Sequence, residues 1–284
     1  MWPICLGLNG FVSSEKVFGL NFQLEEILSH ARDLGYDGIE LFPFHQSYPG
    51  KAHEQRTLRQ FYQGYGLAIP ALQSACQGHA ASPVKRERDA YIESLKAMLE
   101  LAHNVGAGVV GVWSGMPIPG MAPKEQVQWC VDTYQQCAQL AQKADITLAL
   151  EPEPVQVIDS LEDLLKVLDG VKLPCFTAIF DLSHVNVLSR GHPLDFLKSI
   201  HGRIGHVHFT DNDGEVLLSN VEGASHTSKH LAVGDGDMDL VAIINAFRQI
   251  SYSGWMQVDV WENPDPYLAS RKGKEFLDSI KLGG

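Results

Sequence analysis

Short apolar runs alternate with longer segments of helical periodicity along the whole chain. Eight apolar runs have the length of a β-strand, and they cover residues 4–8, 38–42, 67–72, 108–113, 146–151, 175–181, 204–211 and 255–260. After each run, apolar side chains recur every three or four positions, which is the pattern of an amphipathic helix. These segments predict helices over residues 21–34, 51–65, 83–105, 123–144, 160–170, 193–199, 239–249 and 267–280.

The alternation of eight strands with eight helices predicts an α/β fold. The strands are continuous apolar runs, which are typical of parallel strands covered on both faces. The closed arrangement that fits is a (β/α)8 TIM barrel, and we expect a single domain over residues 1–284 with a long loop at about 212–237. An open doubly wound sheet is the alternative. It usually carries a Gly-x-Gly-x-x-Gly turn after its first strand, whereas residues 7–10 here are Gly-Leu-Asn-Gly.

Three helix boundaries have local signals. Ser82 followed by Pro83 predicts an N-cap and the first position of a helix. Ser160, three residues before an acidic residue, predicts a second capped start. Gly35 suits the left-handed position that follows the last turn of a helix.

The composition is that of an ordinary globular protein, with a formal net charge of −12 over 284 residues. Nucleic-acid binding needs a basic face, so we expect neither a nucleic acid nor an anionic membrane as partner. No apolar run approaches the roughly 18 residues of a membrane span, and no signal peptide is recognisable. The five cysteines form no Cys-x-x-Cys motif, which favours reduced thiols and a cytoplasmic location.

Four of the predicted strands end on a side chain that can bind a metal ion. These side chains are Glu151, Asp181, His208 and Asp259. In a barrel the C-terminal ends of all strands meet at one mouth, so the four should converge there. Three carboxylates would repel one another without a cation, and carboxylates with one imidazole suit a divalent ion. We expect one ion, Mn²⁺ in the first place, with Mg²⁺, Co²⁺ or Zn²⁺ as alternatives. Taken singly, each carboxylate could instead cap a helix or lie in a surface loop.

Two histidines stand two positions apart on the seventh predicted strand, so their rings point to the same face. We expect His208, nearer the strand end, to bind the metal ion, and His206 to be hydrogen-bonded deeper in the barrel. Glu40, in the second predicted strand, could enter the mouth of the barrel, but we expect a structural hydrogen bond there.

Several motifs occur in an order that resembles a known family. They are Glu151 after an apolar strand, Phe180-Asp181-Leu-Ser-His184, His206-Val-His208-Phe-Thr-Asp211, Val233-Gly-Asp-Gly-Asp237 before a helix, and a carboxylate on the last strand. Over essentially its whole length the chain resembles the xylose isomerase-like barrel superfamily. Within it the chain is most similar to the sugar phosphate isomerase/epimerase group, which contains ketose 3-epimerases, hydroxypyruvate isomerases and inosose dehydratases.

The resemblance implies roles for the strand-end residues. All four would bind one divalent ion, and Glu151 and Asp259 would be the acid/base pair on either side of the substrate. The epimerases usually carry Glu on the last strand, so Asp259 is shorter by one methylene and the proton-transfer distance changes. Glu262 is a candidate to compensate, although a surface or helix-cap position is the simpler interpretation.

Three further residues are candidates for substrate contact. The resemblance implies that His184 donates or accepts a hydrogen bond at a substrate oxygen. His79, after the third strand, could also contact substrate, or it could be a structural histidine. Glu153 could orient substrate, or it could be a loop charge between two prolines.

These observations predict a divalent-metal-dependent isomerase or epimerase of a sugar or keto-polyol. It would remove a proton α to a carbonyl through a metal-stabilised enediolate. The alternative is a metal-dependent lyase on the same site, which dehydrates an inosose or cleaves a 3-keto-glycoside by elimination. An endonuclease IV-type enzyme would need a basic groove, which the net charge disfavours. A binding module with a structural metal is the non-enzymatic alternative. The expected partner is a small, unphosphorylated sugar or polyol, and a homo-oligomer is compatible with the sequence.

Overall fold

The strands form one parallel sheet that closes into a barrel. The computed structural model describes residues 2–43, 48–74, 76–216 and 227–282. The strands are β1 (Ile4–Gly7), β2 (Gly38–Glu40), β3 (Ala71–Gln73), β4 (Val109–Val112), β5 (Thr147–Leu150), β6 (Phe176–Asp181), β7 (Ile204–Phe209) and β8 (Met256–Val258). Their order in the sheet is β2-β1-β8-β7-β6-β5-β4-β3. Backbone hydrogen bonds between β3 and Leu41, the residue that follows β2, close the ring, for example Gln73 N to Leu41 O at 2.9 Å.

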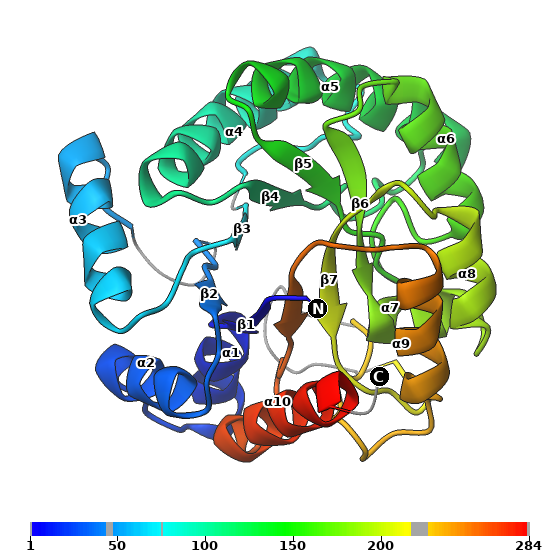
Figure 1. Ribbon diagram of the computed structural model, residues 1–284. Helices are drawn as coiled ribbons and strands as arrows, with labels where there is room; N and C mark the ends of the chain where they lie inside the picture. The colour runs from blue at the N-terminus through cyan, green and yellow to red at the C-terminus, as the bar shows by residue number, and fades with distance from the viewer. Residues whose placement is uncertain (1, 44–47, 75, 217–226, 283–284) are drawn as a thin grey trace.

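The helices surround this barrel, as the view along its axis shows (Figure 1). They are α1 (Asn9–Phe18), α2 (Leu24–Asp33), α3 (Ala52–Gly64), α4 (Lys85–Val105), α5 (Pro123–Lys143), α6 (Leu161–Val171), α7 (Leu182–Leu188), α8 (Pro193–Ser199), α9 (Leu240–Gln249) and α10 (Pro266–Leu282). The prediction of a single-domain TIM barrel is confirmed. None of the helices in the described ranges is both long and apolar enough to cross a membrane.

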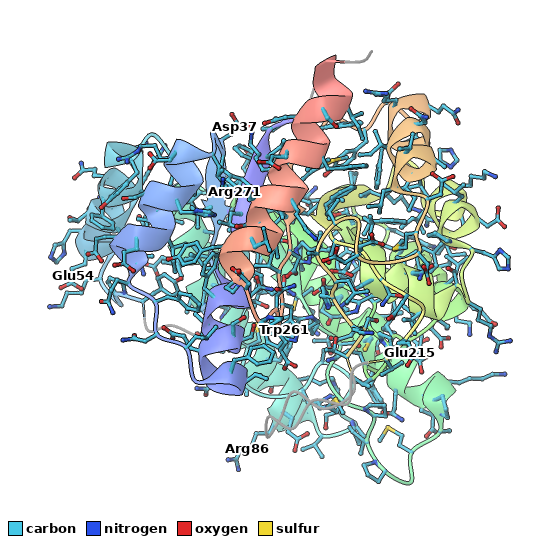
Figure 2. The ribbon with its side chains drawn as sticks, turned by 90° about the horizontal axis from the view of Figure 1, so that it is seen from below. Asp37, Glu54, Arg86, Glu215, Trp261 and Arg271 are labelled. Carbon is cyan, nitrogen blue, oxygen red and sulfur yellow. The ribbon has the colours of Figure 1, made fainter. Side chains whose placement is uncertain are left out.

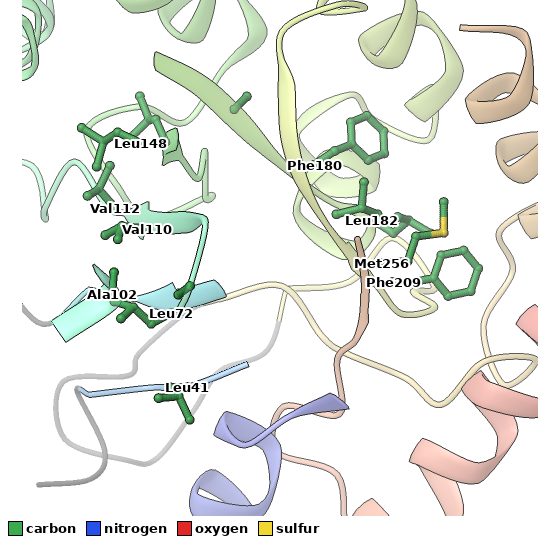
Figure 3. Packing of buried hydrophobic residues seen from close by; sticks show 14 of the residues in the cluster. Leu41, Leu72, Ala102, Val110, Val112, Leu148, Phe180, Leu182, Phe209 and Met256 are labelled. Atoms are coloured by element: carbon green, nitrogen blue, oxygen red, sulfur yellow. The ribbon is translucent and has the colours of Figure 1, made fainter. Parts of the chain in front are cut away.

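Apolar side chains fill the layer between the strands and the helices (Figure 3). Leu148, Phe180 and Phe209 belong to this layer and are fully buried. On β7 the alternation is clear: Val207 and Phe209 pack in the apolar cluster, whereas His206 and His208, which alternate with them, are buried polar groups. Because successive side chains of a strand point to opposite faces, β7 presents apolar residues to the helices and polar residues to the barrel interior.

Two helices were not predicted from the sequence. Residues 9–18 form α1, which is rich in small polar side chains and has no regular apolar stripe. Residues 182–188 form α7, which begins directly after β6 because the side chain of Asp181 accepts a hydrogen bond from the backbone N–H of His184. Both helices lie at the C-terminal ends of strands, next to the predicted site.

One predicted cap is wrong and one is confirmed. The fourth helix begins at Lys85, with Val84 in an extended conformation, and not at Pro83. Ser82 instead accepts a hydrogen bond from the N–H of Val84 and forms a local turn. Ser160 does cap its helix, because its hydroxyl accepts from the N–H of Asp163.

The predicted long loop at 212–237 includes residues 217–226, which lie outside the described residues. On its described flanks, Asp211 pairs with Leu231 and Val216 pairs with Ser228, both in antiparallel bridges. The two ends of the loop therefore lie side by side near the end of β7.

Candidate metal centre

The ends of β5, β6 and β7 bring three of the predicted ligands together at one histidine nitrogen. Nδ1 of His208 lies 2.8 Å from Oε1 of Glu151 and 3.5 Å from Oδ2 of Asp181. All three side chains are buried. One donor atom from each lies within 4.8 Å of the others, a spacing that suits one bound metal ion.

Asp259, just after β8, stands at the edge of this cluster. Its Oδ2 is 3.9 Å from Nδ1 of His208. Both of its oxygens accept hydrogen bonds from Nδ2 of Asn9, at 3.3 and 3.2 Å, and Oδ1 also accepts from the backbone N–H of Trp261 at 2.9 Å. Asp259 therefore reaches the mouth of the barrel, but it is held by the first residue of α1.

The start of α1 packs closely on the chain that follows β8. A Cβ atom on Gly10 would lie 2.3 Å from Cγ2 of Val260 and 2.7 Å from its backbone, so only glycine permits this approach. The hydroxyl of Ser13 accepts from the backbone N–H of Glu262 at 2.9 Å. Glu262 is held there at a φ of 46°, an uncommon conformation for a residue with a side chain. Residues of α1 thus define the path of the segment that carries Asp259 and Glu262.

Asp181 performs two tasks, one with each oxygen. Its Oδ1 accepts from the backbone N–H of His184 at 2.9 Å and from the hydroxyl of Ser183 at 2.7 Å, and so caps α7. Its Oδ2 faces Nδ1 of His208. The helix-cap interpretation and the ligand interpretation of this carboxylate are therefore compatible.

The electrostatics of the cluster favour a cation at its centre. Burial raises the pKa of Glu151, and the carboxylates of Asp181 and Asp259 add to the rise, which His208 opposes. Burial favours the neutral form of His208, but the carboxylates of Glu151 and Glu40 outweigh it and hold the pKa of His208 well above its usual range. The protonated ring places a positive charge among the carboxylates. Oxygens around one imidazole nitrogen are also the donor set of a divalent metal ion, so the residues present fit such an ion.

A second histidine pair lies beside Asp181. Nε2 of His230 is 3.0 Å from Oγ of Ser183 and 3.4 Å from Oδ2 of Asp181, and its Nδ1 is 2.8 Å from the carbonyl oxygen of Ser228. The ring of His184 meets that of His230 edge to face, with centroids 5.2 Å apart. Although burial opposes it, the Asp181 carboxylate raises the pKa of His230 to about 9. His184 thus lies at the mouth, and its contact with substrate stays a prediction.

His79 and Glu153 both line the cavity above the cluster. Nε2 of His79 lies 2.7 Å from the carbonyl oxygen of Met116, and its Nδ1 is 3.1 Å from the N–H of Ala81. Both ring nitrogens of His79 are therefore engaged by backbone, and the ring faces the cavity as a wall. Oε2 of Glu153 accepts from Nε2 of Gln156 at 3.3 Å.

The cavity has a volume of about 340 Å³, within the range of small-molecule sites. Phe42, Trp113 and Trp261 form aromatic parts of its wall. In Figure 2, Trp261 lies beneath the start of α10 among the side chains in the middle of the molecule, whereas Glu54 and Arg86 lie at its edge. Five carboxylates also line the cavity: Glu151, Glu153, Asp181, Asp259 and Glu262. Among the described lining residues, Lys16 is the one lysine or arginine.

A further polar layer lies deeper in the barrel. Oε2 of Glu40 is 2.7 Å from Nε2 of His206, so the expected structural hydrogen bonds of both residues are confirmed. Oε1 of Glu40 is 3.5 Å from Nε2 of His208. All three side chains are buried.

Asp211, at the end of the His206 to Asp211 motif, organises the glycine-rich turn that follows the loop. Its carboxylate accepts from the backbone N–H groups of Gly234, Gly236 and Met238, at 3.0, 3.1 and 3.3 Å. A Cβ atom on Gly236 would lie 2.4 Å from Oδ1 of Asp211. Asp211 therefore shapes the backbone beside the site, and the proposed ligands come from other positions.

Comparison with known proteins shows the family to which this barrel belongs. The family model described as xylose isomerase-like TIM barrel matches residues 28–280. The chain belongs to this family. The inosose dehydratase of Geobacillus kaustophilus (strain HTA426) is 22% identical over 285 residues, covering 92% of this chain and 89% of that protein.

Two solved structures are similar to this xylose isomerase-like barrel over its whole length. A D-tagatose 3-epimerase-like protein has a TM-score of 0.79 at 20% identity, covering 100% of this chain and 99% of the other. The IOLI protein with a bound zinc atom has a TM-score of 0.73 at 17% identity, covering 99% and 98%. At these identities the structural likeness shows the fold alone.

In this member of the family, two site features had no usable signal in the sequence. His230 reaches Asp181 from the far side of the loop, 49 positions away. Asn9 reaches Asp259 across 250 positions. Neither residue belongs to a motif of regular spacing, so only the folded chain brings them to the site.

Proposed function

We propose that the protein is a divalent-metal-dependent isomerase or epimerase of an uncharged sugar or keto-polyol. The observation that carries the proposal is the convergence of Glu151 and Asp181 on Nδ1 of His208, with Asp259 beside them, at the floor of a cavity of monosaccharide size. A single-histidine, multi-carboxylate set of this kind suits an ion that also binds substrate oxygens.

Glu151, Asp181, His208 and Asp259 would hold the ion, with Mn²⁺ as our first choice. A divalent ion bound there acts as a Lewis acid that stabilises negative charge developing on substrate oxygens. Zn²⁺ is supported as an alternative by the similar barrel that was solved with a zinc atom.

Proton transfer falls to two carboxylates of the chain. Glu151, at the end of β5, removes a proton from the carbon next to the substrate carbonyl, and Asp259, beyond β8, returns one. Strands β6 and β7 separate β5 from β8 in the sheet, so the two carboxylates approach the substrate from different directions. Return to the opposite face of the same carbon is epimerisation, and return to the neighbouring carbon is isomerisation.

The cavity lining supports a neutral substrate. Five carboxylates and one lysine line it, so a phosphorylated substrate would meet more repulsion than attraction there. Aromatic walls such as Trp113 and Trp261 suit the apolar faces of a sugar. We assign His184 and Glu153 to hydrogen bonds with substrate hydroxyl or carbonyl oxygens, and His79 to a wall contact.

The second candidate is a dehydratase on the same residues. It is favoured by the similarity to an inosose dehydratase over 92% of the chain. The first step is again removal of a proton next to a carbonyl, but a β-hydroxyl then leaves in place of reprotonation.

One experiment separates the two reactions and tests both. The Mn²⁺-loaded protein is incubated in D₂O with a panel of ketoses and with an inosose, and the products are analysed by mass spectrometry and NMR. Uptake of one deuterium at carbon without loss of water supports the isomerase or epimerase, whereas loss of water supports the dehydratase. If neither exchange nor elimination occurs with any substrate in the metal-loaded protein, the proposal is wrong.

A further inference from the structure

Inside the barrel, one layer further from the mouth than the proposed ligands, Glu40 reaches from β2 to β7. Its Oε2 lies 2.7 Å from Nε2 of His206. In the sheet, β1 and β8 stand between β2 and β7, so this hydrogen bond crosses the barrel interior. Glu40 and His206 are exposed by only 1% and 0%. A carboxylate buried to this degree is costly unless its oxygens are hydrogen-bonded.

The other oxygen of Glu40 faces the proposed ligand His208. Oε1 of Glu40 is 3.5 Å from Nε2 of His208. Within the described part of the chain, neither of these buried atoms has a hydrogen-bond partner. Buried polar atoms are nearly always hydrogen-bonded, and a small side-chain rotation brings this pair within range. Oε1 of Glu40 and Nε2 of His208 are therefore each other's natural hydrogen-bond partners.

The chemistry of imidazole gives this contact a consequence for metal binding. A neutral ring carries its proton on one nitrogen, and only the other nitrogen has a lone pair for a metal ion. Nδ1 of His208 faces Glu151 and Asp181, so it is the nitrogen placed to bind the ion. The proton must then be on Nε2, where a carboxylate is a common partner for a metal-binding histidine.

We propose that Glu40 is a positioning residue that accepts the Nε2 proton of His208 and so directs the Nδ1 lone pair toward the metal site. The inference rests on the proposed function, because it concerns a role toward the bound ion. His206 holds the second oxygen of Glu40 and thereby sets the direction of its carboxylate. Glu40 does not line the cavity, so its effect on the ion passes through His208.

The first test is the metal affinity of Glu40→Gln, measured by titration calorimetry with Mn²⁺ and Zn²⁺. The substitution keeps the shape of the side chain but removes its charge and one acceptor oxygen. We expect the affinity to fall about 10- to 100-fold, as for other partners of metal-binding histidines. Cys5→Ala is the matched control, because Cys5 is buried beside Glu40 and His206, with its sulfur within 4.8 Å of their nearest donor atoms. It tests whether any change in this buried layer lowers the affinity. We expect wild-type affinity in this control.

The second test needs no Glu40 variant and so remains informative if Glu40→Gln fails to fold. Wild-type protein with ¹⁵N-labelled histidine is loaded with Zn²⁺, and the signals of His208 are assigned by their loss in His208→Gln. We expect NMR to show a proton on Nε2 of His208 and none on Nδ1.

Two results would overturn the inference while the proposed function stands. One is a folded Glu40→Gln protein that binds metal as tightly as wild type, and the other is a proton on Nδ1 of His208 in the zinc-loaded protein. If the wild-type protein binds neither ion, the proposed function itself fails, and the inference falls with it.

Discussion

The ends of β5, β6 and β7 differ from the end of β8 in how they present a side chain to the site. Glu151 and Asp181 approach Nδ1 of His208 to 2.8 and 3.5 Å, and their positions are set by nearby barrel elements. Asp259 stays at 3.9 Å and is held by Asn9, from the opposite end of the chain. The positions of Glu151 and Asp181 are thus set by adjacent strands, whereas the position of Asp259 depends on how α1 packs against the end of β8. Asp259, one methylene shorter than the Glu that the family resemblance implies, therefore lies on the side of the site that depends on the docking of α1.

The largest effect is expected from Glu151→Gln, at the end of β5. Gln keeps the size of the side chain and can still pair with Gln73, the present partner of Oε2. Because it can neither accept the substrate proton nor neutralise the cation, we expect kcat to fall about 10³- to 10⁴-fold. Deuterium exchange into the substrate measures this. Glu153→Gln is the control, with a much smaller loss. Equal losses in both variants would contradict the assignment of the base.

Asp259→Asn and Glu262→Gln together test the β8 side. If Asp259 returns the proton, Asp259→Asn should lower kcat about 10²-fold, while Glu262→Gln should retain most of it. Asn preserves the volume and one acceptor oxygen, so the fold should be maintained, as circular dichroism would verify. The reverse pattern would transfer the role of second base to Glu262, which lines the same cavity.

Asn9→Ala removes the contact that holds Asp259 at α1. Hydrogen bonds to a buried carboxylate are lost, so we expect the free energy of unfolding in urea to fall by about 1.5 to 3 kcal/mol. Asn21→Ala is the control, since the side chain of Asn21 accepts an exposed hydrogen bond from Gln23. If Asn9→Ala is no less stable than the control, the contact with Asp259 is not a stabilising one.

Gly10→Ala disturbs the packing of α1 against the segment after β8 without changing a polar group. The added Cβ would meet Val260 at 2.3 Å, and backbone is part of the obstacle, so we expect a loss of about 1 to 3 kcal/mol in the free energy of unfolding. Gly64→Ala, at the end of α3, has nothing within 4 Å of the new methyl group and should not destabilise. Similar stability of the two variants would show that α1 can move away from β8.

The barrel itself was predictable because its signals are local and repeated. Each predicted apolar run overlaps one of the strands β1 to β8, and most predicted helices are present, although the third strand begins at Ala71 and not at residue 67. The two missed helices had weak patterns for different reasons. In α1 the buried positions include Ser13 and Ser14, which make polar contacts, so no apolar stripe marks it. In α7 the helix has only seven residues and follows β6 directly, so it is too short for a periodic pattern to mark it.

The candidate site was predictable to the extent that it lies at strand ends. Glu151, Asp181 and His208 were selected because barrel topology brings such positions together, and the structure does bring them together. His79 was a weaker choice, since a sequence cannot indicate that both ring nitrogens are engaged by the backbone of Met116 and Ala81. Such contacts depend on the course of two loops.

The sequence alone determined the fold class and the strand ends at which the candidate ligands lie. The periodicity of apolar residues and the order of the strands can be read directly from the sequence, because neither depends on distant contacts. Only the tertiary structure decided which oxygen of each carboxylate faces His208, that Asp259 is held by α1, and that Glu40 and His206 are hydrogen-bonded to each other. These contacts join residues up to 250 positions apart, and their distances depend on packing to within an ångström.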